Sequence, residues 1–188
     1  MSVPKLLIIG SKDFAQLVKN LAVDAGYEFI GFIDDYNKGN NIVGTTSELN
    51  VNFDKQNVQV AIGIGYNNLP ARKSVIGKVL DLGFEMPNLI HPNAYIASSV
   101  LLGSGNIIMN NASIDHFSKI GDGNVFWPGS IISHDCKMGD NNFISPSATI
   151  CGFCKISNSN FIGAGVILVD RVTLSSDNYI KAGALVKR

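Results

Sequence analysis

The sequence is poor in the features that mark several classes of protein. Charged residues make up only 16% of its 188 residues, and fifteen basic side chains balance fifteen acidic ones. No block of like charge stands out, which argues against a nucleic-acid or anionic-membrane partner. No apolar run approaches the length of a membrane span, and Leu6 to Ile9 are too short for a signal peptide. The low charge of so small a chain predicts substantial buried contact between subunits.

Cysteine is also scarce. The chain has three, Cys136, Cys151 and Cys154, and this odd number predicts no disulfide framework. Cys151 and Cys154 match a lone C-x-x-C, but no second pair completes a zinc site, so we favour small side chains packed in the interior. We therefore expect a reduced, cytoplasmic setting and no metal.

One periodic stretch dominates the rest of the sequence. From Ile90 to Val186 an aliphatic or aromatic residue recurs at every sixth position, seventeen times in succession. Asparagine also recurs every eighteen residues, at Asn106, Asn124, Asn142, Asn160 and Asn178. Three six-residue units therefore form one turn, which predicts a parallel β-helix whose coils rise by about 4.8 Å. We expect the asparagines to form a ladder down one corner, in a left-handed backbone conformation.

The first part of the chain lacks this period. Apolar runs at 5–9, 28–33 and 58–64 alternate with helical spacing at 13–25 and about 70–82, which predicts a small parallel, Rossmann-like α/β unit. Residues 40–57 are polar and are expected to be irregular. The sequence thus predicts two domains, 1–88 and 89–188.

Candidate ligand contacts in the first domain follow its strands, where open α/β sheets bind their ligands. They are Gly10, Ser11, Asp34, Asp35 and Gly65. Gly10-Ser11 precedes a helix and could hold phosphate on backbone N–H groups. The motif is not G-x-G-x-x-G, so a plain turn capped by Asp13 is an equal alternative. Asp34-Asp35 lies where ribose or base contacts fall, although two acids in a loop are more often simply solvated.

Only three histidines exist, His91, His116 and His134. His116 and His134 are eighteen residues apart, so they should occupy the same position on successive coils, about 5 Å apart. Asp135 follows His134, and a neighbouring carboxylate can fix the tautomer of an imidazole that acts as a general base. Taken alone, such a pair is more often structural.

From Leu6 onward the chain resembles the bacterial hexapeptide-repeat sugar acyltransferases, which include sialic acid O-acetyltransferases and N-acetyltransferases of nucleotide-linked amino sugars. The family's His-Asp/Glu-Cys segment, followed by Ile-Gly-Asp, is matched by His134 to Asp140, and its Phe-Ile-Gly-Ala-Gly segment by Phe161 to Gly165. The stretch from Ser145 to Gly152 is similar to a further family segment. The resemblance implies a nucleotide-sugar-binding α/β unit, a left-handed β-helix, and a homotrimer with active sites between subunits.

The resemblance also implies roles for individual residues. His134 would be the general base, Asp135 its orienting partner, and Gly152 a backbone N–H donor to the thioester oxygen. Coenzyme A would run past Gly163, Ala164, Lys181 and Ala182. The nucleotide of the sugar would be lined by Gly10, Ser11, Asp34, Asp35 and Gly65.

The sequence departs from the family at a few positions. Phe143 stands where many members have a second histidine, and Trp127-Pro128 replaces a common Asn-Thr. His116 is not a usual family residue, so it either replaces a lost sugar contact or is simply exposed.

The expected activity is direct transfer of an acetyl group from acetyl-CoA to the amine of a nucleotide-linked amino-deoxy sugar, without a covalent acyl-enzyme. Three alternatives stay open. They are O-acetylation of a sialic-acid-type sugar, a β-helix metal hydratase with histidine ligands from adjacent subunits, and non-catalytic binding of a nucleotide sugar.

Overall fold

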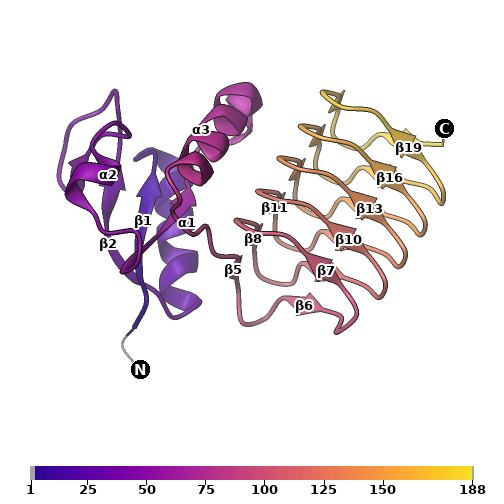
Figure 1. Cartoon of the computed structure of the whole chain (residues 1–188). Helices are drawn as coiled ribbons and strands as arrows, with labels where there is room; N and C mark the ends of the chain where they lie inside the picture. Colours follow the sequence, from indigo (N-terminus) through magenta and orange to yellow (C-terminus); the bar gives the residue numbers. More distant parts are fainter. Residues whose placement is uncertain (1–2, 188) are drawn as a thin grey trace. The chain divides into compact units, whose positions relative to one another are not determined.

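The computed structural model of the protein describes residues 3–187, and the chain forms two compact units (Figure 1). One unit ends at Leu89 and the other begins at Ile90. Each has its own hydrophobic core, made by sheet and helices in the first unit and by the inside of a coil in the second.

The first unit is a four-stranded, fully parallel sheet in the order β3-β2-β1-β4. Its strands are β1 (Lys5–Ile9), β2 (Glu28–Ile33), β3 (Ile42–Gly44) and β4 (Val58–Ile62). Its helices are α1 (Asp13–Asp24), α2 (Leu49–Asn52) and α3 (Leu69–Asp81), with a 3-10 turn η1 (Tyr66–Asn68). Alternate strand residues such as Leu7 and Ile62 share a core with Ile76 and Val79 of α3, which confirms the predicted α/β unit.

Two local predictions for this unit are wrong. Residues 40–57 were expected to be irregular, but they contain β3 and α2, which are too short to leave a periodic signal. Gly31 allows β3 to approach β2, because a Cβ on Gly31 would lie 2.5 Å from Val43 Cγ2. Asp13 is not the cap of α1; it is the first helical residue, and the cap position is Lys12, which makes no side-chain capping bond.

The second unit is a parallel β-helix of about five turns, which confirms the fold predicted from the repeat. Every strand has two residues, and the second residue of each is the apolar residue of the six-residue repeat. The strands are β5 (Leu89–Ile90), β6 (Tyr95–Ile96), β7 (Leu101–Leu102), β8 (Ile107–Ile108), β9 (Ser113–Ile114), β10 (Lys119–Ile120), β11 (Val125–Phe126), β12 (Ile131–Ile132), β13 (Lys137–Met138), β14 (Phe143–Ile144), β15 (Thr149–Ile150), β16 (Lys155–Ile156), β17 (Phe161–Ile162), β18 (Ile167–Leu168), β19 (Thr173–Leu174), β20 (Tyr179–Ile180) and β21 (Leu185–Val186).

These strands form three sheets, which are the three faces of the coil. Their orders are β19-β16-β13-β10-β7, β20-β17-β14-β11-β8-β5 and β21-β18-β15-β12-β9-β6. Figure 1 shows the first of these as a row of stacked arrows. Successive strands along the chain belong to successive faces, so each connecting turn is a corner of the coil. Each corner repeats every eighteen residues.

The asparagine ladder is present, but its conformation differs from the prediction. Oδ1 of Asn124 accepts hydrogen bonds from the backbone N–H and the side-chain amide of Asn142, at 2.8 and 3.0 Å, and the pattern repeats along the column. The left-handed residue is the one before each asparagine. A positive φ recurs every six residues from Gly105 to Gly183 and includes Asn141 and Ser159. The preceding residue makes the turn, so the asparagine side chain can point inward, where Asn124, Asn142 and Asn160 are fully buried.

Candidate active site

His134 and Asp135 lie in the corner that joins β12 to β13. Asp135 has a φ of 58°, a left-handed conformation that aspartate tolerates better than most residues. Its Oδ2 lies 3.0 Å from Nδ1 of His134, and the two side chains are 39% and 47% exposed. A carboxylate on Nδ1 holds the proton there, so a neutral imidazole presents the lone pair of Nε2. This pairing meets the geometric requirement for an oriented general base.

Gly152 closes one side of the imidazole from the next coil. A Cβ at Gly152 would lie 2.9 Å from Cε1 and 3.0 Å from Nε2 of His134, so no larger residue fits without moving the ring. The backbone joins the two coils here, because the Phe153 N–H donates to the His134 carbonyl at 3.1 Å. The glycine therefore leaves space at the nitrogen that can accept a proton.

Two side chains that the sequence interpretation missed lie beside this pair. The Phe153 ring meets the His134 ring edge to face, with 5.2 Å between centroids, and the Arg171 guanidinium lies 4.4 Å from the Phe153 centroid. A hollow of about 300 Å³ is lined by Asp135, Lys137, Phe153, Lys155, Arg171 and Thr173. Phe153 and Arg171 follow Asp135 at intervals of eighteen residues, and that spacing is the signal that could have revealed them.

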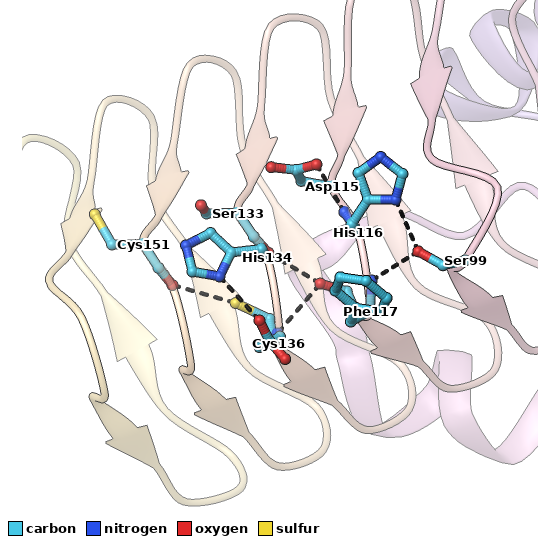
Figure 2. A network of polar contacts seen from close by, with 10 residues as sticks. Ser99, Asp115, His116, Phe117, Ser133, His134, Cys136 and Cys151 are labelled. Carbon is cyan, nitrogen blue, oxygen red and sulfur yellow. Dashed lines mark hydrogen bonds and ion pairs between the residues drawn. The ribbon is translucent and has the colours of Figure 1, made fainter.

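His116 lies one coil below His134, and Figure 2 shows both imidazoles on the same side of the coil. Its Nδ1 is 2.8 Å from the Ser99 hydroxyl, which also accepts the Phe117 N–H at 3.0 Å. The His116 backbone N–H donates to the Asp115 carboxylate. The His116 side chain is exposed. Exposure is compatible with both roles expected from the sequence, a side chain that is simply exposed and one that contacts the sugar.

Cys136 and Cys151, near this corner, are poor candidates for a nucleophile. Cys136 is buried, and its thiol donates to the Cys151 carbonyl at 3.2 Å (Figure 2). A hydrogen bond with Cys154, together with burial, raises the pKa of the Cys136 thiol. Burial, followed by the nearby Asp170 carboxylate, raises the pKa of Cys151. A raised pKa keeps the thiol protonated and unreactive.

The residues expected to contact coenzyme A lie at a different corner. Gly163 and Ala164 follow β17, and Lys181 and Ala182 follow β20 on the next coil. They pack together, because a Cβ on Gly163 would lie 2.5 Å from the Ala182 nitrogen. Within one chain, the whole face that contains β12 and β18 separates this corner from the corner of His134. A single chain therefore does not bring the two groups together.

In the first unit, the ends of β1, β2 and β4 converge. The Gly10 N–H donates to the Ile33 carbonyl at 2.8 Å, and the Gly63 N–H donates to the Ile9 carbonyl at 2.7 Å. Gly10 has a φ of 99°, and a Cβ there would lie 3.0 Å from the Gly63 carbonyl oxygen. Gly65 is less restricted, with only Phe14 at ordinary contact distance. The turn after β1 thus leads into α1 without a side-chain cap on its N-terminal N–H groups.

The two acidic candidates hold this loop region together. The Ser11 hydroxyl donates to Asp34 at 2.5 Å, and the Asp34 carboxylate also accepts the N–H groups of Tyr36 and Asn37. Burial alone raises the pKa of Asp34, but these hydrogen bonds outweigh it and lower the pKa to about 2. Asp35 accepts the N–H and the hydroxyl of Thr46, both at 2.7 Å. Both carboxylates are therefore engaged by the chain itself.

Between residues 3 and 187, no group of three or more His, Cys, Asp or Glu side chains is arranged to hold a metal ion. Over the same range, no helix is long and apolar enough to cross a membrane.

Two protein-family models match the chain. Residues 5–79 match the PglD N-terminal domain, and residues 117–152 match the bacterial transferase hexapeptide, six repeats. A search of curated proteins found no match.

Solved structures of sugar acetyltransferases match nearly the whole chain. The acetyltransferase domain of PglB from Neisseria gonorrhoeae is 29% identical, with a TM-score of 0.91, over 97% of this chain and 91% of that one. The same domain in complex with acetyl coenzyme A is 27% identical, with a TM-score of 0.90, over 98% and 93%. PerB from Caulobacter crescentus, in complex with CoA and GDP-perosamine, is 27% identical, with a TM-score of 0.90, over 100% and 90%.

The two family models match the first unit and the coil in turn, and the solved structures cover both. They confirm the resemblance drawn from the sequence motifs. The chain is an acyltransferase that matches the hexapeptide-repeat sugar acyltransferase family.

Proposed function

We propose that the protein transfers the acetyl group of acetyl-CoA to the amine of a nucleotide-linked amino sugar. The observation that supports this most directly is the His134 imidazole, held at Nδ1 by Asp135 and left open at Nε2 by Gly152. The similarity to PerB, whose structure contains CoA and GDP-perosamine, supports the classes of donor and acceptor.

In the proposed mechanism, His134 acts as the base for the attacking amine. The amine forms a bond to the thioester carbon and loses a proton to Nε2 of His134, and the C–S bond then breaks. The imidazolium returns its proton to the departing thiolate, so the histidine is regenerated. Asp135 stabilises the imidazolium through Nδ1. The raised pKa of the Cys136 and Cys151 thiols argues against an acyl intermediate on either of these two residues.

The negative charge that develops on the thioester oxygen needs a donor, and the Gly152 N–H is the proposed one. Backbone donors fixed before the reaction stabilise such charge without reorganisation. The peptide that carries this N–H is held at its carbonyl, because the Cys151 carbonyl accepts the Cys136 thiol at 3.2 Å. The following peptide is held by the next coil, because the Gly152 carbonyl accepts the Arg171 N–H at 2.9 Å.

We further propose a homotrimer whose active sites lie between subunits. The support is the separation of the His134 corner from the corner of Gly163, Ala164, Lys181 and Ala182 by one face of the coil. Donor and base can meet if that corner of one subunit approaches His134 of another. The cytoplasm is the proposed location, because Cys136, Cys151 and Cys154 are free thiols, as in a reducing compartment.

The turn of Gly10 and Ser11 at the uncapped end of α1 is the proposed phosphate contact in the first unit, with Gly65 nearby. Asp34 and Asp35 would act there mainly by fixing the loop, since both carboxylates accept hydrogen bonds from their own chain. His116, exposed one coil from the base, is the proposed additional contact to the sugar.

The test is release of thiol from acetyl-CoA in the presence of UDP-, GDP-, dTDP- and CMP-linked sugars, each with an amine or a hydroxyl at the same ring position. The proposal expects release with amino sugars of one nucleotide series. Release with the hydroxyl sugars alone would assign the protein as an O-acetyltransferase. Binding of both substrates without release would make it a non-catalytic binding protein.

His134→Ala provides the matching variant. We expect kcat to fall by roughly 10²- to 10⁴-fold, the usual contribution of a general base, while the Kd for acetyl-CoA stays unchanged. Lys73→Gln, an exposed substitution on α3, serves as the control. Full turnover by His134→Ala with intact donor binding would show that another group takes the proton.

A further inference from the structure

One face of the β-helix carries a column of lysines that the proposed mechanism does not use. Lys119, Lys137 and Lys155 are the first residues of β10, β13 and β16, in the row of arrows seen in Figure 1. Strand pairing sets Lys119 opposite Lys137, and Lys137 opposite Lys155. All three are exposed, and within residues 3–187 none of their ammonium groups has a hydrogen bond or an ion pair.

This arrangement is unfavourable for an isolated chain. Like charges placed directly opposite on neighbouring strands destabilise a sheet, and here three lie in register at a spacing of about 4.8 Å. Asp135 is the acid that lines a hollow with Lys137 and Lys155, and its carboxylate accepts a hydrogen bond from Nδ1 of His134 at 3.0 Å. An anionic ligand would supply the missing counter-charge.

The surface along the column is hollowed in two places. A hollow of about 880 Å³ is lined by all three lysines together with apolar residues such as Leu101 and Met138. The smaller hollow of about 300 Å³ is lined by Lys137, Lys155, Arg171 and Asp135. Lys137 and Lys155 line both hollows, so the two hollows adjoin at these residues. The smaller one combines three cationic side chains with one carboxylate.

We propose that Lys137, Lys155 and Arg171, extended by Lys119, form a binding site for the diphosphate of the nucleotide-linked sugar. This inference rests on the proposed function. Asp135 and Phe153, which both contact His134, line the same hollow as the cations, so an anion bound there lies beside the base.

The distance along each substrate favours the sugar over coenzyme A. In a nucleotide-linked amino sugar, one sugar ring separates the reacting amine from the diphosphate. In acetyl-CoA, the whole pantetheine arm separates the thioester from its diphosphate. A cationic site next to the base therefore fits the acceptor.

The first experiment measures the Tm with and without inorganic pyrophosphate. This measurement does not depend on catalytic turnover. We expect pyrophosphate to raise the Tm of the wild-type protein and to raise it far less in Lys137→Gln/Lys155→Gln. Without ligand, the double variant should have a Tm equal to or above that of the wild type, since it relieves repulsion between like charges. Lys5→Gln/Lys73→Gln, on the first unit, removes two exposed charges elsewhere and should respond like the wild type. An undiminished pyrophosphate shift in Lys137→Gln/Lys155→Gln would overturn the proposal.

The second experiment separates the two possible sources of the diphosphate by steady-state kinetics. For Lys137→Gln/Lys155→Gln we expect the KM for the nucleotide sugar to rise about tenfold or more, as for the loss of two charge-assisted contacts, with the KM for acetyl-CoA unchanged. Lys137→Arg/Lys155→Arg should recover most of the affinity. A rise in the KM for acetyl-CoA alone would assign the site to the donor and overturn the proposal. If no amino sugar is a substrate, the proposed function fails, whereas the pyrophosphate experiment still reports on the site.

Discussion

Gly152 is the residue on which the space around the His134 imidazole depends most directly. Its backbone does not have a positive φ, so an alanine could adopt the same conformation. The obstacle is the ring itself, because the new Cβ would lie 2.9 Å from Cε1 and 3.0 Å from Nε2. A substitution at Gly152 therefore tests whether the His134 corner has a catalytic role or only a structural one.

We expect Gly152→Ala to lower kcat at least about tenfold, since a displacement of about 1 Å at a catalytic group can cost far more than that. The Tm should change little, because His134 is exposed and can swing toward solvent. Gly77→Ala is the control, since nothing lies within 4 Å of a Cβ there and the helix should be slightly stabilised. Unchanged kcat in Gly152→Ala would mean that the position of the His134 ring is unimportant.

Asp34 is expected to make the first unit sensitive to acid. The folded pKa of about 2 is below the ordinary value of 3.8, so the carboxylate stabilises the fold above that value and loses the contribution as the pH falls toward 2. The difference corresponds to about 2 kcal/mol at neutral pH. Asp34→Asn should lower the free energy of unfolding by up to that amount at pH 7, with the gap closing near pH 2.

Denaturant unfolding at several pH values measures this effect. Asp81→Asn is the control, because Asp81 is exposed at the end of α3. If the difference in unfolding free energy between Asp34→Asn and the wild type stayed constant from pH 7 to pH 2, the stabilisation could not come from the charged Asp34 carboxylate.

At the level of elements, the asparagine ladder places polar side chains inside the coil, where each depends on hydrogen bonds to the next asparagine. Asn142 is fully buried, and its Oδ1 accepts both the N–H and the side-chain amide of Asn160. Asn142→Ala would leave these buried donors without an acceptor, which costs about 1–3 kcal/mol for each unsatisfied group. The ladder thus stabilises the coil as a series of linked layers.

We expect Asn142→Ala to lower the Tm by several degrees. Asn178→Ala should lower it less, because Asn178 is the last residue of the ladder and accepts no further asparagine. Calorimetry of the two variants makes the comparison. Equal decreases in Tm would show that a buried asparagine inside the ladder stabilises the coil no more than the asparagine at its end.

The β-helix could be predicted almost completely from the sequence, because the interior of the coil requires an apolar side chain at every sixth position. Ile108 and Ile144 mark strand ends as reliably as any motif. The left-handed positions were misplaced by one residue, since a ladder of asparagines indicates stacking without showing which backbone makes the turn. In the first unit, β3 is a three-residue edge strand and left no period to detect.

The candidate site could be predicted only in part. His134, Asp135 and Gly152 share one corner, as the eighteen-residue spacing suggested. Phe153 and Arg171 were overlooked because an aromatic and a basic side chain at a turn have no motif of their own. The partners of Asp34 and Asp35 could not be predicted, since hydrogen bonds between loops depend on how the loops fold.

At the level of the whole molecule, one face of the coil indicates how copies of the chain would associate. The face that contains β12 has exposed apolar residues at the first position of several strands: Tyr95, Ile131, Ile167 and Leu185. It lies between the corner of His134 and the corner of Gly163 and Ala164. Burial of this face against another subunit would both cover apolar surface and bring unlike corners together.

Ile131→Glu should therefore abolish self-association and activity together while the chain stays folded. Ile131 is 44% exposed, so a carboxylate there is solvated in the monomer but buried in an interface. Light scattering, circular dichroism and thiol release measure the three properties. Lys38→Gln, on an exposed loop of the first unit, is the control for the change in charge. A monomeric Ile131→Glu variant with full activity would show that one chain holds a complete site.

The left-handed residue at every sixth position from Gly105 to Gly183 restricts how this chain can change in length. Loss or gain of one residue within a turn would put the wrong side chain inside the coil for every strand on one side of the change. Loss of six would restore the interior but rotate that side by one face, so Gly152 would no longer stand above His134. Only a whole coil of eighteen residues can be duplicated or deleted without disturbing the columns, so such a protein is expected to lengthen or shorten in whole turns.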